Sequence, residues 1–153
     1  HHVTNNLGMM GPLFGLIVRQ KDNITQNRIT VVNELWADGL AGYFLGAMAR
    51  EERLNNDDID QILRAALKIG DDSPHKHVRN LDQNTFRHGS SIQRRNWVQK
   101  GMLARQFSEI RPHHDLELTY KLSEPTKKEL QILAPKSMRF GLAMNFIWSL
   151  LSN

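Results

Sequence analysis

The chain has 153 residues, 40% of them hydrophobic and 24% charged, with a formal net charge of +4. This length and composition suit one soluble globular domain with a real core. No Cys is present, which excludes disulfides and thiolate zinc ligands, so a bound metal would need His and carboxylate ligands. There is no signal peptide and no run of 18 apolar residues. The positive charge permits contact with nucleic acid, but a solvated basic surface explains it better.

The first 70 residues predict helices. Residues 1–18 are rich in apolar residues and glycine, which indicates a helix end followed by a loosely helical or turning segment. A long helix is predicted from about residue 25 to Arg50, because apolar residues recur there at helical spacing. The next helix is predicted to begin after a cap at Asn55 or Asn56 and to end at Gly70, a residue suited to the left-handed conformation at a helix end.

Residues 71–89 form a polar stretch without apolar periodicity, and such loops tend to be functional or disordered. Ser90 and Gln93 then form a capping box, which predicts the start of a helix that runs through Met102. The basic residues of this region are interpreted as a solvated face: Arg94, Arg95, Lys100 and Arg105. Four His residues are interpreted as solvated loop residues: His75, His77, His113 and His114.

The pattern changes after about residue 107. Apolar and polar residues alternate over 116–122, which predicts a small half-buried strand. A short helix is expected after Pro125. Residues 138–151 are apolar on nearly every side and predict a last helix, too short to span a bilayer, that contacts the core or a protein partner.

Two acidic residues stand out in the long helix. Between Leu35 and Ala49 the only charged residue is Asp38, and Glu34 lies one turn before it. Both carboxylates therefore project from one side of an apolar helix and need a cation. The spacing alone favours a salt bridge with Arg or Lys, and a metal ion is the alternative.

Short blocks in this order resemble the putative neutral zinc metallopeptidase family. That family reads H-E-x-G-H-H-V-Q, then E-L-Q-A-D-C-x-A-G, then I-G-D-D, then F-x-H-G-T-S-x-Q-R. The resemblance covers about residues 1–107. The matching blocks of this chain are H-H-V at 1–3, N-L-G at 6–8, E-L-W-A-D at 34–38 with A-G at 41–42, the segment 57–66, I-G-D-D at 69–72, and F-R-H-G-S-S-I-Q-R at 86–94.

The resemblance implies zinc-assisted hydrolysis of a peptide or protein substrate. It implies that His1 and Glu34 are zinc ligands, His1 being the second His of H-E-x-x-H. It implies that Asp38 orients a ligating His, and more loosely that His88 acts on the transition state or positions the substrate. Relatives are expected to be membrane-anchored or extracytoplasmic.

This chain departs from the family pattern. The first His and the catalytic Glu of H-E-x-x-H would precede His1, and Thr4, Gly39 and Ser90 replace Gln, Cys and Thr. Because a catalytic zinc needs three protein ligands, we expect the chain to be a truncated or degenerate member that is inactive alone. Whether it is an enzyme is therefore left open.

The expected fold is mainly α: a zincin-like helical metallopeptidase subdomain with a small strand element and a C-terminal apolar helix. Residues 1–107 would form the metallopeptidase-like region, with 108–153 packed on it as an extension. One alternative is a non-catalytic structural or interaction subunit derived from this family. Another is an unrelated helical module in which Glu34 and Asp38 form a buried salt bridge.

Overall fold

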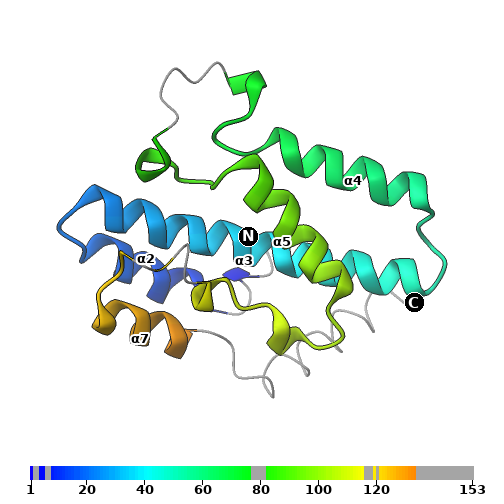
Figure 1. Ribbon diagram of the computed structural model, residues 1–153. Helices are drawn as coiled ribbons and strands as arrows, with labels where there is room; N and C mark the ends of the chain where they lie inside the picture. The colour runs from blue at the N-terminus through cyan, green and yellow to red at the C-terminus, as the bar shows by residue number, and fades with distance from the viewer. Residues whose placement is uncertain (2–3, 6–7, 77–81, 116–118, 120, 134–153) are drawn as a thin grey trace.

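The computed structural model describes residues 1, 4–5, 8–76, 82–115, 119 and 121–133. This part of the chain is mainly α-helical, as predicted. The long helix α3 runs through its middle, with α4 and α5 on one side and α2 and α7 on the other (Figure 1). The α-helices are α2 (Met10–Val18), α3 (Asn23–Arg50), α4 (Asn56–Lys68), α5 (Ser91–Leu103) and α7 (Glu124–Leu133), and the 3-10 turns are η1 (Pro74–Lys76), η2 (Gln83–Thr85), η3 (Phe107–Glu109) and η4 (Pro112–His114).

Helix α3 forms where the apolar spacing predicts it, and it begins at Asn23 because the side chain of Asp22 caps it. Asp22 Oδ1 accepts a hydrogen bond from the amide of Thr25 at 2.7 Å, which satisfies one of the free amides of the first turn. Its middle turns are buried, and Trp36 is fully enclosed. The indole of Trp36 donates to the carbonyl of Ile110 at 3.2 Å, so the segment after α5 is held against α3.

Helices α3 and α5 pack with their backbones almost in contact, because glycines face each other at the crossing. A Cβ atom on Gly42 would lie 2.1 Å from the carbonyl oxygen of Val98. A Cβ on Gly101 would lie equally close, 2.1 Å from the carbonyl oxygen of Gly39. Real side chains do not approach so closely, so only glycine permits this crossing. This close crossing also fixes which residues of α5 lie over Glu34 and Asp38, the acidic turn of α3.

The two predicted helix caps around this crossing are confirmed. Asn55 caps α4 in a reciprocal capping box with Asp58. Ser90 caps α5 in the same way with Gln93, at distances of 2.9 and 3.1 Å. Helix α4 packs on α5 through a second, smaller apolar cluster, made of Leu63, Ala66, Val98 and Met102. The predicted polar loop between these helices contains the short turns η1 and η2.

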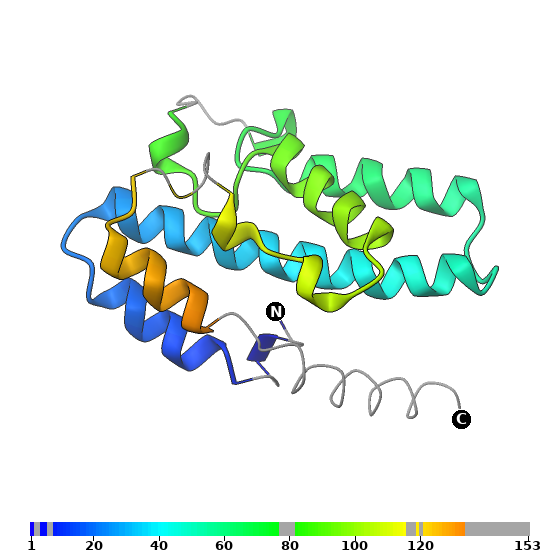
Figure 2. The same ribbon diagram turned by 60° about the horizontal axis from the view of Figure 1, so that its bottom comes forward.

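Helices α2 and α7 lie side by side on the opposite side of α3 (Figure 2). Helix α7 confirms the short helix expected after Pro125, and it begins at Glu124. Of the predicted strand, the structure describes residues 119, 121 and 122, and none of these is in a strand. Its other positions and the predicted helix 138–151 lie outside the described residues. Among the helices that are described, none is long and apolar enough to span a membrane.

One of the four His residues interpreted as solvated is buried, so that interpretation is wrong for His113. It lies in η4 with only 5% of its surface exposed. Its ring packs against Trp36 at a centroid distance of 4.9 Å and against His114 at 4.4 Å. Burial, together with the nearby positive charges of His114 and Arg111, lowers the pKa of His113 from 6.5 to about 4.

Candidate functional site

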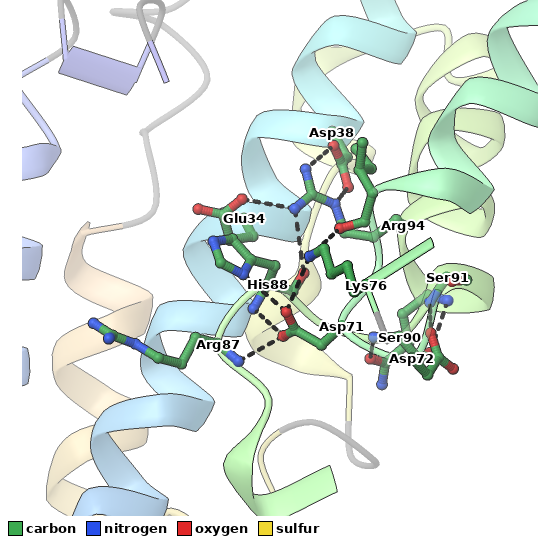
Figure 3. Close-up of polar contacts among 12 residues, drawn as sticks. Glu34, Asp38, Asp71, Asp72, Lys76, Arg87, His88, Ser90, Ser91 and Arg94 are labelled. Atoms are coloured by element: carbon green, nitrogen blue, oxygen red, sulfur yellow. Dashed lines mark hydrogen bonds and ion pairs between the residues drawn. The ribbon is translucent and has the colours of Figure 1, made fainter. Parts of the chain in front are cut away.

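The site is built around the acidic turn of α3. Glu34 and Asp38 project from the same side of the helix, as their spacing predicts, and both side chains are largely buried, with 12% and 9% of their surface exposed. Arg94, from the first turns of α5, lies between them (Figure 3). Its Nε and Nη2 donate to the two carboxylate oxygens of Asp38, with Nη2 2.8 Å from Oδ1. Its Nη1 donates to Glu34 Oε2 at 2.7 Å.

The interpretation of Arg94 as part of a solvated face is therefore wrong. Its side chain is 8% exposed, whereas Arg95 beside it is half-buried and Lys100 and Arg105 are exposed. Burial disfavours the charged guanidinium, but the carboxylates of Asp38 and Glu34 outweigh it and raise the pKa of Arg94 above its ordinary value. Burial raises the pKa of the Asp38 carboxyl, and the hydrogen bonds from Arg94 oppose this rise.

His1, the first residue of the chain, also contacts the carboxylate of Glu34. Its Nε2 lies 2.8 Å from Glu34 Oε1, the oxygen that Arg94 does not bind. A short turn holds it there, because the carbonyl of His1 accepts from the hydroxyl of Thr4 and the amide of Asn5, both at 2.9 Å. The structure thus brings together His1 and Glu34, the two residues that the family resemblance implied as metal ligands.

The contacts of Asp38 differ from what the resemblance implied. There it was expected to orient a ligating His. In the structure its two oxygens bind the guanidinium of Arg94, which also binds Glu34.

His88 lies in the loop before α5, and Asp71 fixes it from the start of the long loop (Figure 3). Asp71 Oδ1 lies 2.9 Å from the Nδ1 of His88. The other oxygen, Oδ2, accepts from the backbone amides of Arg87 and His88 at 2.7 and 2.6 Å. Since an ionised carboxylate only accepts, the imidazole proton lies on Nδ1 in the neutral ring, which leaves Nε2 as an acceptor. Half of the His88 side chain is exposed, so the ring is accessible from solvent.

The same loop closes because the blocks at 69–72 and 86–94 meet. A Cβ on Gly70 would lie 2.0 Å from the amide nitrogen of Ser91, so only glycine lets α5 begin there. Asp72 Oδ1 accepts from that amide at 2.6 Å, and the amide of Asp71 donates to the carbonyl of Gly89 at 2.8 Å. The ends of a 19-residue stretch are thereby joined beside the acidic turn.

We expect Asp71→Asn to release the His88 loop, because an amide has a single acceptor oxygen and cannot accept all the bonds that the two carboxylate oxygens now receive. Burial opposes ionisation of Asp71, but the hydrogen bonds from His88, Arg87 and Lys76 outweigh it and lower its pKa. Loss of hydrogen bonds to a charged group should cost about 2 kcal/mol of unfolding free energy. Amide hydrogen exchange should also quicken at Arg87 and His88. Asp60→Asn, at an exposed position of α4, is the control and should change neither quantity.

His1 and Glu34 are the types of ligand that zinc accepts in a protein without Cys, and their donor atoms are already close. The charges also favour a cation. One guanidinium offsets only one of the two enclosed carboxylates, and the remaining negative charge faces His1. Among the residues that the structure describes, however, no group of three His, Asp or Glu could hold a metal ion. This part of the chain therefore brings together two side chains of the types that zinc accepts, whereas a catalytic zinc site needs three protein ligands.

Comparison with known proteins gives the class of this chain. Residues 1–110 match the family described as putative neutral zinc metallopeptidase, and the chain belongs to that family. It is 36% identical over 106 residues to the uncharacterized protein YpfJ of Escherichia coli, both in strain K12 and in strain O6:H1. These matches cover 66% of this chain and 35% of the relatives, so the chain spans about a third of their length. No solved structure matches it.

Sequence reasoning missed two residues of the site, Arg94 and Asp71. A signal existed for both. Arg94 ends the F-x-H-G block, whereas Arg95 lies outside the matching block, and Asp71 is the first acid of I-G-D-D. Block membership separates the buried arginine from the neighbouring one, which helical spacing alone does not.

Proposed function

We propose that this chain forms part of a zinc metallopeptidase in which His1 and Glu34 are two of the zinc ligands. The observation that carries the proposal is the 2.8 Å approach of His1 Nε2 to Glu34 Oε1, across a sequence separation that only the fold can close. Membership of the family supports the choice of zinc. The remaining ligand and the acid–base Glu would come from residues of a longer protein, as the H-E-x-x-H motif implies.

In this proposal His1, Glu34 and His88 have different roles. His1 and Glu34 would hold the ion through one nitrogen and one oxygen. Zinc bound there would polarise a peptide carbonyl and activate a water molecule. His88, with its Nδ1 fixed by Asp71, would present Nε2 to the substrate, where its protonated form can donate a hydrogen bond to an oxygen that gains negative charge.

Zinc affinity tests the proposal directly. Competition between the purified chain and a chromophoric chelator gives the affinity for zinc alone. His1→Ala and Glu34→Gln should each weaken zinc binding by more than the roughly 10–100-fold that loss of an outer partner of a metal ligand costs. The matched controls are His114→Ala and Glu51→Gln, both at exposed positions, which should leave the affinity unchanged. Unaltered affinity in both site variants would refute the proposal.

A non-catalytic structural subunit is the second candidate function. The observation that favours it is that Arg94 already binds both carboxylates, so the acids have a cation without a metal. In that case the acidic turn would serve only to join α3 to α5. The same titration separates the two functions, because a structural ion pair predicts zinc binding that does not depend on Glu34.

A further inference from the structure

Every nitrogen of the Arg94 guanidinium is directed at an oxygen of the site. Nε and Nη2 bind Asp38. Nη1 donates both to Glu34 Oε2 at 2.7 Å and to the backbone carbonyl of His88 at 3.3 Å. One side chain therefore contacts the proposed ligand, the acid one turn further along, and the loop that carries the exposed imidazole.

The geometry of these bonds gives the two acids different roles. The guanidinium is a rigid plane, so binding two of its nitrogens to Asp38 fixes the direction of the third. That nitrogen holds Glu34 by Oε2 alone. The other oxygen, Oε1, is left facing His1 at 2.8 Å. Asp38 thus acts as the anchor that orients Arg94, and Arg94 decides which oxygen of Glu34 is available.

The bond to the carbonyl of His88 extends the same control to the loop. Asp71 holds this loop by the amides of Arg87 and His88, and Arg94 holds it by the carbonyl. The loop is therefore fixed from both sides of the peptide chain at His88. A shift of Arg94 would move Glu34 and the His88 loop together.

We propose that Arg94 is a positioning residue, which leaves Glu34 only Oε1 for the metal and keeps the His88 loop next to it. This inference rests on the proposed function, since it assumes that Glu34 is a zinc ligand. It goes further by stating how Glu34 binds, through one oxygen, and which residue imposes this. A purely structural ion pair would join the same helices without any effect on metal binding through Glu34.

A double-mutant cycle on zinc affinity distinguishes the two roles. Arg94→Lys keeps the positive charge but cannot bind two carboxylates with a planar fork. It should weaken zinc binding roughly 10–100-fold in the wild-type background. In the Glu34→Gln background the same change should alter the affinity by less than about twofold, because the residue through which it acts is already lost. Arg95→Lys, at the next position of α5, is the control and should have no effect in either background.

A second variant keeps the test decisive if Arg94→Lys does not fold. Asp38→Asn leaves Arg94 in place but weakens its anchor, so it should also reduce zinc affinity, and only while Glu34 is present. Equal losses with and without Glu34, or no loss in the wild-type background, would overturn the positioning role and leave the ligands as proposed. Zinc affinity that does not respond to Glu34→Gln would instead overturn the proposed function, and this inference with it.

Discussion

Arg94→Met should lower the free energy of unfolding by about 3–5 kcal/mol, the cost expected when one partner of a buried ion pair is removed. The two carboxylates it binds are 12% and 9% exposed, so neither can recover its hydration when the guanidinium is lost. Their mutual repulsion adds to the cost, since they lie one turn apart on α3. Urea denaturation at neutral pH, followed by circular dichroism, measures the change.

Two further variants make this prediction specific. Arg95→Met changes the same residue type at the adjacent position, which is only half-buried, and should alter the stability by less than about 0.5 kcal/mol. Adding Asp38→Leu to Arg94→Met removes one of the two enclosed charges that have lost their partner. It should restore part of the loss, because buried ion pairs replaced by apolar residues are often neutral for stability. A small loss in Arg94→Met itself would mean that water reaches the acidic turn.

The ion cluster of Glu34, Asp38 and Arg94 contributes both to the packing of α5 on α3 and to the proposed metal site. A guanidinium bound to both acids stabilises the crossing of α3 and α5, and the same crossing points Glu34 Oε1 at His1. The glycines at the crossing allow the backbones of α3 and α5 to lie this close together, since a Cβ on Gly42 would lie 2.1 Å from the backbone of α5. The proposed ligand is thus held by a rigid helix pair, which suits a site that must keep its geometry.

The helices could be predicted because their signals are local. The capping residues Asn55 and Ser90 and the apolar spacing of α3 each lie within the element that they define. The acidic pair could be predicted for the same reason, because an acid one turn from another in an apolar helix needs a cation wherever the rest of the chain lies. Its proximity to His1 followed from the resemblance.

The sequence predicts Arg94 and His113 to be exposed to solvent, and both predictions are wrong because the burial of these residues depends on distant contacts. Arg94 and Arg95 are adjacent and identical, and only the crossing of α5 over α3 buries the first. His113 lies in a polar stretch, and its burial depends on Trp36, which is 77 residues earlier in the sequence. No periodicity within five or ten residues encodes such a contact, although the family block did contain Arg94.

His113 should make the protein progressively less stable between pH 6.5 and 4. Its pKa is about 4 in the folded chain and 6.5 when exposed, because burial against Trp36 disfavours the imidazolium. As the pH falls through this range the unfolded chain binds a proton that the folded chain does not, so folding loses up to about 3 kcal/mol. The stability from the neutral ring is complete above pH 6.5. Urea denaturation at intervals from pH 7.5 to 4 measures the loss.

The comparison with His113→Phe isolates this residue from the carboxylates that titrate over the same range. Phe keeps an aromatic ring against Trp36 and has no proton to bind, so the variant should show a shallower fall, with the difference between the two proteins growing toward pH 4. His114→Gln alters the exposed neighbour and should keep most of the wild-type dependence. Parallel curves for wild type and His113→Phe would mean that His113 binds its proton as readily in the folded chain as in the unfolded chain. The enclosed position beside Trp36 makes that outcome costly, since among the described residues its Nδ1 has no hydrogen-bond partner to stabilise the charge.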